Sequence, residues 1–446
     1  MFEAVKNIFK IEELKKKVLI TLALLVVYRI GCYIPTPGID TFALNKFFEN
    51  LQRTQGQTLL GIIGIFTGGA LDRLSIFALG VMPYISSSII MQLLTAVIPH
   101  LERLAKEGKA GYEKINQYTR YLTFFLCVIQ GLFLAMWLEN PGNFQGIQMV
   151  HDPGIVFKFI TVLTLTCGTV FIMWLGEQIQ ERGIGNGISL IIMTSIISRI
   201  PSSLTQLYVL TSTKDIPITT VIALLVLWVL IVMAVILFTQ AQRRIPVQYG
   251  KRVVGRRVYG GQSTYLPIRV DMSGVIAIIF AQSVILFPAT LATFMPKKFK
   301  IVVFLQMLLQ ERGIWYNFIY VLLIFFFMYF YTAIVFNPQE ISNNLKKYGG
   351  FIPGIRPGKT TGEYLDFVAT RIVFVGALYV SLVAIFPNFI MHIFNVPSYA
   401  LASFFGGTTL LIMVGVILDT MKQIEGQLMV RHYEGFIKGG SLKARR

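Results

Sequence analysis

Residues 59–94 read LLGIIGIFTGGALDRLSIFALGVMPYISSSIIMQLL, and this stretch decides the fold. Its first part, Leu59–Leu74, is apolar but short, contains four glycines and ends on the charge pair Asp72–Arg73. Glycines weaken a helix and charges are costly in lipid, so protein or a water-filled cavity must surround such a segment at membrane depth. We expect a short re-entrant helix. The residues alone equally allow a helix-packing face, because Gly64 and Gly68 form a small-xxx-small pair.

Long apolar runs recur from end to end of the chain. Hydrophobic residues make up 54% of the sequence and charged residues 14%, whereas a soluble domain is about a quarter charged. Apolar windows of roughly 17–25 residues fit the hydrocarbon core of a membrane. We therefore expect an all-α polytopic membrane protein with ten transmembrane helices. These spans are Val18–Ile34, Ser75–Ile98, Tyr121–Leu138, Ile155–Leu175, Ile184–Ile200, Ile218–Phe238, Ser273–Phe294, Trp315–Phe336, Ile372–Phe389 and Ala400–Met421.

The distribution of basic residues predicts the orientation. The amphipathic segment 1–17 and the tail 422–446 are both basic, and an even number of spans puts both on one side. Arg243–Arg269 holds seven Lys or Arg and no acid, while Glu139–Pro153 and Asn388–Tyr399 hold no Lys or Arg. The positive-inside rule therefore predicts cytoplasmic termini. We expect no cleavable signal peptide, because the first apolar run lacks a small-residue cleavage site.

The spans divide into two halves of five. The N-terminal half covers 18–200 and the C-terminal half 218–421, with an outer hinge loop at 201–217 between them. The cytoplasmic loops of the second half are 239–271 and 337–371. Equal halves of opposite direction are typical of an inverted repeat, which places its pathway at the interface between the halves. We therefore expect a central, hourglass-shaped pore.

Ionisable residues are almost absent from the span centres, which argues against proton- or ion-coupled transport. Arg29 and Asp419 lie near span ends. Two spans carry neutral polar groups instead: the second has Ser86, Ser87, Ser88 and Gln92, and the seventh has Gln282 and Ser283. Interhelical hydrogen bonds there contribute about 0.6–2 kcal/mol, enough to hold two helices and weak enough to let them part. Ordinary bundle packing is the alternative.

The other motifs in the sequence do not predict a catalytic or ligand-binding site. Gly354–Thr360, GIRPGKT, is close to a phosphate-binding P-loop but is one residue short between its glycines and contains Pro357. Gly183–Gly187, GIGNG, suits a hinge opening a short span better than an anion cradle. No catalytic, cofactor-binding or metal-ligating constellation is present, so we do not expect an enzyme.

Six stretches make the chain resemble the SecY/Sec61 family of protein-conducting channels along nearly its whole length. They are IPTPGID (Ile34–Asp40), FTGGALDRLSIFALGVMPYISSSIIMQLL (Phe66–Leu94), WLGEQIQERGIGNGISLII (Trp174–Ile192), GRRVYGGQSTYLPIRVDMSGVI (Gly255–Ile276), FNPQEISNNLKKYGGFIPGIRPGKTT (Phe336–Thr361) and FGGTTLLIMVGVILD (Phe405–Asp419).

The resemblance implies three structural elements. The re-entrant segment is the plug, with Ile65, Phe66, Thr67, Gly68, Gly69, Ala70, Leu71, Asp72 and Arg73. The family's pore ring maps onto six aliphatic residues, Val81, Ile85, Ile188, Ile192, Ile279 and Ile412; Val81 is one methylene smaller than the isoleucine often found there. Spans two, three, seven and eight resemble the lateral gate, with Ser86, Ser87, Ser88, Gln92, Gln282, Ser283 and Phe287 on or near it.

The resemblance also implies partners. The family's contacts with the translocation ATPase SecA and with ribosomal RNA map onto Arg256, Arg257, Lys346, Lys347 and Arg356; topology alone is the other explanation for this charge. SecE and SecG would be the small membrane subunits, with signal sequences, unfolded preproteins and membrane lipids as further partners. The expected function is translocation of secretory polypeptides and sideways release of transmembrane segments at a bacterial inner membrane. A secondary transporter for a small solute is the alternative.

Overall fold

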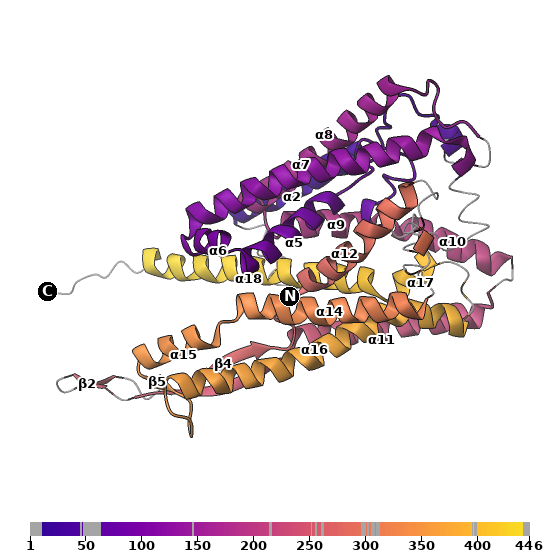
Figure 1. Cartoon of the computed structure of the whole chain (residues 1–446). Coiled ribbons are helices and arrows are strands. Elements are labelled where there is room, and N and C mark those ends of the chain that lie inside the picture. Colours follow the sequence, from indigo (N-terminus) through magenta and orange to yellow (C-terminus); the bar gives the residue numbers. More distant parts are fainter. Residues whose placement is uncertain are drawn as a thin grey trace.

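A computed structural model defines the architecture. The structure describes residues 11–44, 47, 64–144, 147–213, 216–250, 252–254, 257–259, 263–295, 300, 303–304, 308, 313–394, 396 and 399–439. Long α-helices dominate this part of the chain (Figure 1). The first half forms α2 (Glu12–Gly31), α5 (Met82–Val97), α6 (Pro99–Lys106), α7 (Lys109–Glu139), the 3-10 helix η1 (Pro141–Phe144), α8 (Ile155–Arg182), α9 (Gly187–Ile197) and α10 (Ile200–Ser212). The second half forms α11 (Ile218–Gln240), α12 (Val275–Phe294), α14 (Ile314–Val335), α15 (Pro338–Lys347), α16 (Lys359–Phe394), α17 (Tyr399–Phe405) and α18 (Thr408–Gly439).

All ten predicted spans fall on these helices, and the chain is a multi-pass membrane protein. By length and hydropathy, the described residues contain eight helices able to cross a membrane, or nine if α5 and α6 count as one bent span. The expected count of ten is therefore not reproduced by this criterion. Helix α2 corresponds to the first predicted span. It is not counted because it contains too many charged residues, among them Lys15, Lys16, Lys17 and Arg29.

The second span starts later than expected. We predicted Ser75, but residues 75–80 form turns and α5 begins at Met82. Gly80 has a φ of 58°, a left-handed conformation that ends regular helix, and Pro83 occupies the first turn of α5, where its missing amide costs nothing. At the other end Pro99 begins α6, and the chain bends by 98° between the two helices.

The expected hinge loop at 201–217 is mostly helical. Helix α10 covers Ile200–Ser212 and follows α9 almost directly. Pro201 lies in its first turn, where proline favours a helix start rather than a break. The glycine-rich loop before α9 has a structural role: Asn186 Oδ1 accepts from the Ser189 amide as a helix cap, and Gly185 donates to Gln423 Oε1 of α18 at 3.0 Å.

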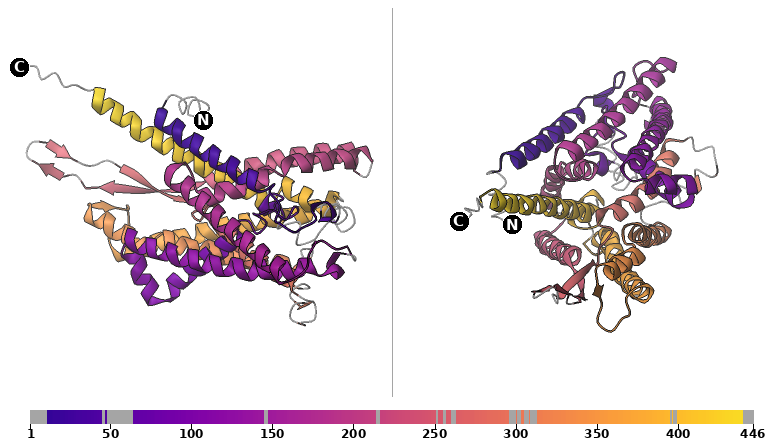
Figure 2. Two further views of the ribbon diagram at one scale, coloured as in Figure 1. Left: turned by 90° about the horizontal axis from the view of Figure 1, so that it is seen from above. Right: turned by 90° about the vertical axis from the view of Figure 1, so that its left-hand side faces the viewer.

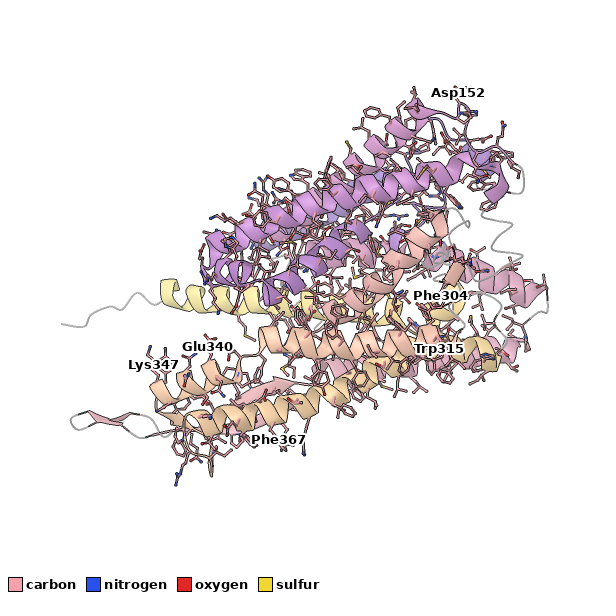
Figure 3. All side chains as sticks on the ribbon, viewed as in Figure 1. Asp152, Phe304, Trp315, Glu340, Lys347 and Phe367 are labelled. Atoms are coloured by element: carbon pink, nitrogen blue, oxygen red, sulfur yellow. The ribbon has the colours of Figure 1, made fainter. Side chains whose placement is uncertain are left out.

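Five short strands, which we did not predict, occupy the loops assigned to the cytoplasm. Strands β1 (Gln242–Tyr249) and β4 (Ser263–Arg269) pair antiparallel, and β5 (Gly350–Phe351) adds to the other edge of β1. Strands β2 (Arg252–Val254) and β3 (Arg257–Tyr259) form a separate hairpin. Because β5 comes from the segment between α14 and α16, the sheet joins the two loops at 239–271 and 337–371. In Figure 3, Lys347 lies at this end of the molecule and Asp152 and Trp315 lie at the other.

The two halves of the chain form separate helical bundles, and these bundles contact each other on two sides (Figure 2). On one side α12 packs against α5 and α7, and on the other α18 packs against α9. Helix α18 also packs against α11 and α12, so it lies between the bundles. At Gly415 of α18 an added Cβ would come within 2.2 Å of Val275, which shows how closely α18 and α12 approach.

Gly168 of α8 provides a test of close packing within the first half. An alanine Cβ there would lie 1.9 Å from the carbonyl oxygen of Ile76, in the turns that precede α5. Gly168→Ala is therefore expected to destabilise the protein by about 1–3 kcal/mol, measured as a lower thermal unfolding midpoint in mild detergent. Gly131→Ala in α7 is the matched control, because its nearest neighbour, Val162 Cα, would be 3.5 Å away. Equal midpoints for the two variants would contradict the close packing.

Candidate functional site

The glycine-rich segment lies buried between the two bundles. Of the predicted plug residues, Ile65, Phe66, Thr67, Ala70 and Leu71 are each no more than 5% exposed. Residues 64–67 form one helical turn and 68–74 form turns, so the helix in this part is shorter than we expected; 59–63 lie outside the described residues. Gly68 and Gly69 have φ values of 64° and 84°, which glycine adopts without strain.

Polar contacts fix this segment to the helices around it. Arg199, between α9 and α10, forms an ion pair with Asp72. Arg29 Nη1 of α2 donates to the carbonyl oxygen of Gly68 at 3.2 Å, and the Arg73 guanidinium lies 4.2 Å from the centre of the Tyr33 ring. The chain after the segment pairs with 34–36, where the Thr36 amide donates to Leu74 and the Ile76 amide donates to Ile34. The segment is thus held by Arg199, by Arg29 and by the backbone of residues 34–36.

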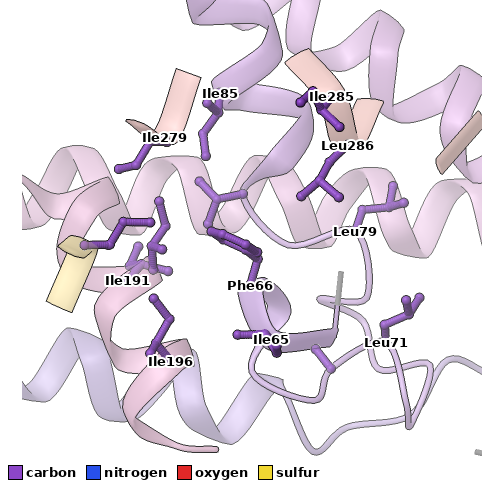
Figure 4. Close-up of a cluster of buried hydrophobic side chains, with 14 of the residues drawn as sticks. Ile65, Phe66, Leu71, Leu79, Ile85, Ile191, Ile196, Ile279, Ile285 and Leu286 are labelled. Carbon is purple, nitrogen blue, oxygen red and sulfur yellow. The ribbon is translucent and has the colours of Figure 1, made fainter. Parts of the chain in front are cut away.

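The aliphatic residues predicted for the pore ring come from four helices and the residue before α5. Val81, Ile85, Ile192, Ile279 and Ile412 are at most 6% exposed and belong to one buried cluster that also contains Ile65 and Phe66. In Figure 4, Ile85 of α5 and Ile279 of α12 lie close together, with Phe66 beside the same cluster. Ile188 differs, because it is half-buried and its Cδ1 lies against Gly176 of α8.

The predicted gate residues lie on α5 and α12, which pack against each other. Ser86, Ser87, Gln282 and Ser283 are buried; Ser88, Gln92 and Phe287 are half-buried. We expected hydrogen bonds between the helices. Instead Ser87 and Ser283 donate to carbonyl groups one turn earlier in their own helices, and Gln92 donates to Ser88.

Aromatic contacts join α12 to α7. The rings of Trp137 on α7 and Phe294 on α12 are 5.5 Å apart, centre to centre. Trp137 also meets Phe144 of η1 at 4.5 Å, and Phe144 meets Phe47 at 4.8 Å. Such ring contacts favour certain packing geometries but need no directional bond.

The turn before α12 is held by hydrogen bonds to Asp271. Asp271 Oδ1 accepts from the Gly274 amide at 2.8 Å and from Ser273 Oγ at 3.3 Å. Burial raises the pKa of the Asp271 carboxyl above its usual range, although these two hydrogen bonds lower it. Only five residues separate β4 from α12. Helix α12 is therefore closely coupled to the sheet of β1, β4 and β5.

The basic residues predicted to bind partners gather near one end. Lys346 and Lys347 are exposed in the last turn of α15, and Arg356 is exposed in the turn after β5. Ser342 of α15 donates to the Gly358 carbonyl and so holds that turn against the helix. Arg257 lies on β3, and Arg256 lies outside the described residues.

Comparison with known proteins decides the family. The sequence profile described as SecY matches residues 75–421. The chain belongs to the SecY family. It is 46% identical over 439 residues to the protein translocase subunit SecY of Aquifex aeolicus, covering 98% of this chain and 100% of that one. It is also 46% identical to the Escherichia coli K12 subunit, over 97% of this chain and 95% of that one.

Solved structures agree with this assignment at the level of the fold. The chain is similar to the structure described as a protein conducting channel, with a TM-score of 0.63 and 16% identity over 96% of this chain and 95% of that one. It is similar to Sec61 in a canine ribosome-channel complex, with a TM-score of 0.61, 16% identity and the same coverage. The SecY fold expected from the sequence is thereby confirmed.

Sequence reasoning missed two of the plug's attachments. It placed Arg29 near a span end without a partner, and it did not consider Arg199 as a partner for Asp72. A signal was present, because an arginine at the end of an apolar span needs a partner at that depth. Asp72 is the acidic residue of the plug and was already noted as costly in lipid.

Asp72→Asn tests this attachment. The substitution removes the carboxylate that pairs with Arg199, and a hydrogen bond to a charged group contributes about 1.5–3 kcal/mol. We expect about a tenfold higher ion conductance of the resting protein in planar bilayers. Glu139→Gln is the matched control, since Glu139 is half-buried on the same side and pairs with Lys158 at 2.8 Å, away from the plug. Equal conductance in both variants would contradict a holding role for the ion pair.

Proposed function

We propose that this chain forms the pore through which a Sec translocon moves unfolded secretory polypeptides, and that it releases transmembrane segments sideways into lipid. The observation that carries the proposal is one buried aliphatic cluster where the two bundles meet, with the plug residues Ile65 and Phe66 packed into it. The SecY family is a family of translocation channels and not an enzyme class. The residues assigned below are part of the proposal.

The aliphatic cluster would act as the seal. Val81, Ile85, Ile192, Ile279 and Ile412 carry no group that could replace the hydration shell of an ion, so a constriction made of them resists leakage by staying dry. The same side chains form no directional bonds. They can therefore close around polypeptides of any sequence. We include Ile188 because it lies one turn before Ile192 on α9.

The contact between α5 and α12 would act as the lateral gate. Ser87 and Ser283 bond within their own helices, so parting the helices leaves these two hydrogen bonds intact. An apolar signal sequence inserted there gains about 25 cal/mol for each Å² of apolar surface removed from water. Pro288 within α12 removes one helical hydrogen bond near the outer end and gives that helix a point at which to bend.

The exposed basic residues would dock the driving partners. Lys346, Lys347 and Arg356 lie together at the end that carries the β2–β3 hairpin with Arg257. Such a surface suits the phosphates of ribosomal RNA or acidic groups of SecA. Small membrane subunits of the SecE and SecG type would cover parts of the apolar helices left exposed, such as α11. The basic loops and termini favour a cytoplasmic position for this end, and the membrane would be a bacterial inner membrane.

A small-solute transporter built from an inverted repeat is the second candidate. Such proteins bind their substrate at mid-membrane with charged groups, broken helices or unwound backbone. Here the corresponding space between the halves is filled by aliphatic side chains, which offer no ligand to a solute. That observation favours the protein-conducting pore.

Ile192→Asn tests the seal. An amide placed among the aliphatic residues lacks hydrogen-bond partners in the closed state, which costs about 1–3 kcal/mol and favours wetting. We expect ion leak to rise by about tenfold and precursors with defective signal sequences to be exported. Ile192→Leu, which keeps volume and polarity, should leave both measurements unchanged. If the Asn and Leu variants behave alike in leak and in signal selectivity, the seal does not lie at this residue.

Arg356→Glu tests the docking surface. Reversing an exposed charge leaves packing intact but places a like charge opposite an acidic partner, so ATP-driven export with added SecA should fall at least about tenfold. Purification yield and unfolding midpoint should not change. Lys359→Glu is the control, because Lys359 is exposed three residues further on and already pairs with Glu363 at 3.8 Å. Normal export by the Arg356 variant would show that Arg356 is not part of the docking surface.

A further inference from the structure

A small cavity lies in the second half, at the end of the helices that carries the sheet. Its walls come from α11, α12, α16 and α18 and from the turn before α12. Most of the lining is apolar, but Asp271, Tyr379 and Thr239 contribute polar groups. The cavity has a volume of about 10 Å³. A single buried water needs about 10–15 Å³, so the space is just large enough for one.

The Tyr379 hydroxyl lacks a partner in this cavity. Its oxygen is buried and forms no hydrogen bond within the part of the chain that the structure describes. The ring cannot easily turn the hydroxyl elsewhere, because it stacks on Phe238 of α11 with 3.8 Å between the ring centres and 3° between the planes. A buried hydroxyl without a partner is unfavourable, and such groups are generally paired with protein or with ordered water.

Two acceptors border the same cavity. Asp271 lies close enough to Tyr379 to act on it electrostatically. Asp271 Oδ1 already accepts two hydrogen bonds, which leaves Oδ2 for a further donor. The carbonyl oxygen of Val270 points toward α16, since a Cβ added to Gly376 would lie 2.6 Å from it. A water molecule would therefore meet one donor and two acceptors, and buried waters typically form about three hydrogen bonds.

We propose that one water molecule occupies this cavity and joins the Tyr379 hydroxyl of α16 to the Asp271 carboxylate in the turn before α12. The water accepts a hydrogen bond from Tyr379 and donates to Asp271 Oδ2 and to the Val270 carbonyl. Gly376 leaves room for this arrangement, because any side chain there would press on that carbonyl. The bridge fixes the turn before α12 to α16, and it involves neither the plug nor the predicted pore ring.

Tyr379→Phe tests the water through the sign of its effect on stability. Removing a hydroxyl that has no partner would raise the unfolding midpoint, because an unfavourable polar group leaves the interior. Removing one that is bonded to a water would lower the midpoint, because the water loses its donor. We expect a decrease of about 2 °C for the full-length protein, with any subunits that co-purify, in mild detergent.

Tyr364→Phe is the matched control. Tyr364 lies on the same helix and is half-buried, but it does not line the cavity, so its variant should keep the parent midpoint. A raised or unchanged midpoint in Tyr379→Phe would overturn the proposal. An equal decrease in both variants would also overturn it, because the effect would then not come from the cavity.

Direct observation of the water is the second measurement. A cryo-electron microscopy map of the protein in lipid nanodiscs, at a resolution that shows ordered water, should contain one peak about 2.7–3.2 Å from Tyr379 Oη and from Asp271 Oδ2. The peak should be lost or weakened in Tyr379→Phe. An empty cavity, or a direct hydrogen bond between Tyr379 and Asp271, would contradict the proposal. A peak with six or more oxygen ligands at about 2.3–2.6 Å would mean a metal cation instead of water.

Discussion

The structure depends on irregular backbone that is buried between two helical bundles. Peptide groups at membrane depth must find partners inside the protein, because lipid offers none. Residues 64–80 meet this requirement with their own turns, with two hydrogen bonds to 34–36 and with the Arg29 side chain. The two bundles must therefore stand apart far enough to enclose the segment. That separation creates the space between the halves, and the aliphatic residues then close it.

Closure combines two physically different kinds of contact. Aliphatic side chains at the meeting of the bundles exclude water but accept any neighbour of suitable shape, so their contact can reform around something else. The polar contacts of the plug depend on particular atoms, above all the Arg199–Asp72 pair and the Arg29–Gly68 hydrogen bond. Once broken, they leave charged groups that need water or new partners. The aliphatic residues thus exclude water from the space between the bundles, whereas the polar contacts select one position of the plug.

Apolar length and charge placement predicted the helices, the membrane and the burial of the glycine-rich segment, because these follow from lipid itself. The predicted start of α5 was wrong because Gly80 and Pro83 determine the start through backbone conformation, which a hydropathy window does not measure. Helix α10 was missed because 201–217 was read as a loop between the two halves. The β5 edge of the sheet was missed because it pairs with β1 about a hundred residues earlier, and Arg199–Asp72 likewise joins distant segments. Long-range pairs leave no local signal.

The sheet of β1, β4 and β5 gives the end of the molecule that carries α15 a short mechanical route to α12. Strand β1 is hydrogen-bonded on one edge to β5, next to α15 and the turn with Arg356, and on the other to β4. Strand β4 leads within five residues to α12, whose start is fixed by Asp271. The Val270 amide also donates to Ala241, at the end of α11. A partner that displaces the sheet would therefore move α12 against α5, because packed strands and a short hydrogen-bonded linker absorb little of the displacement.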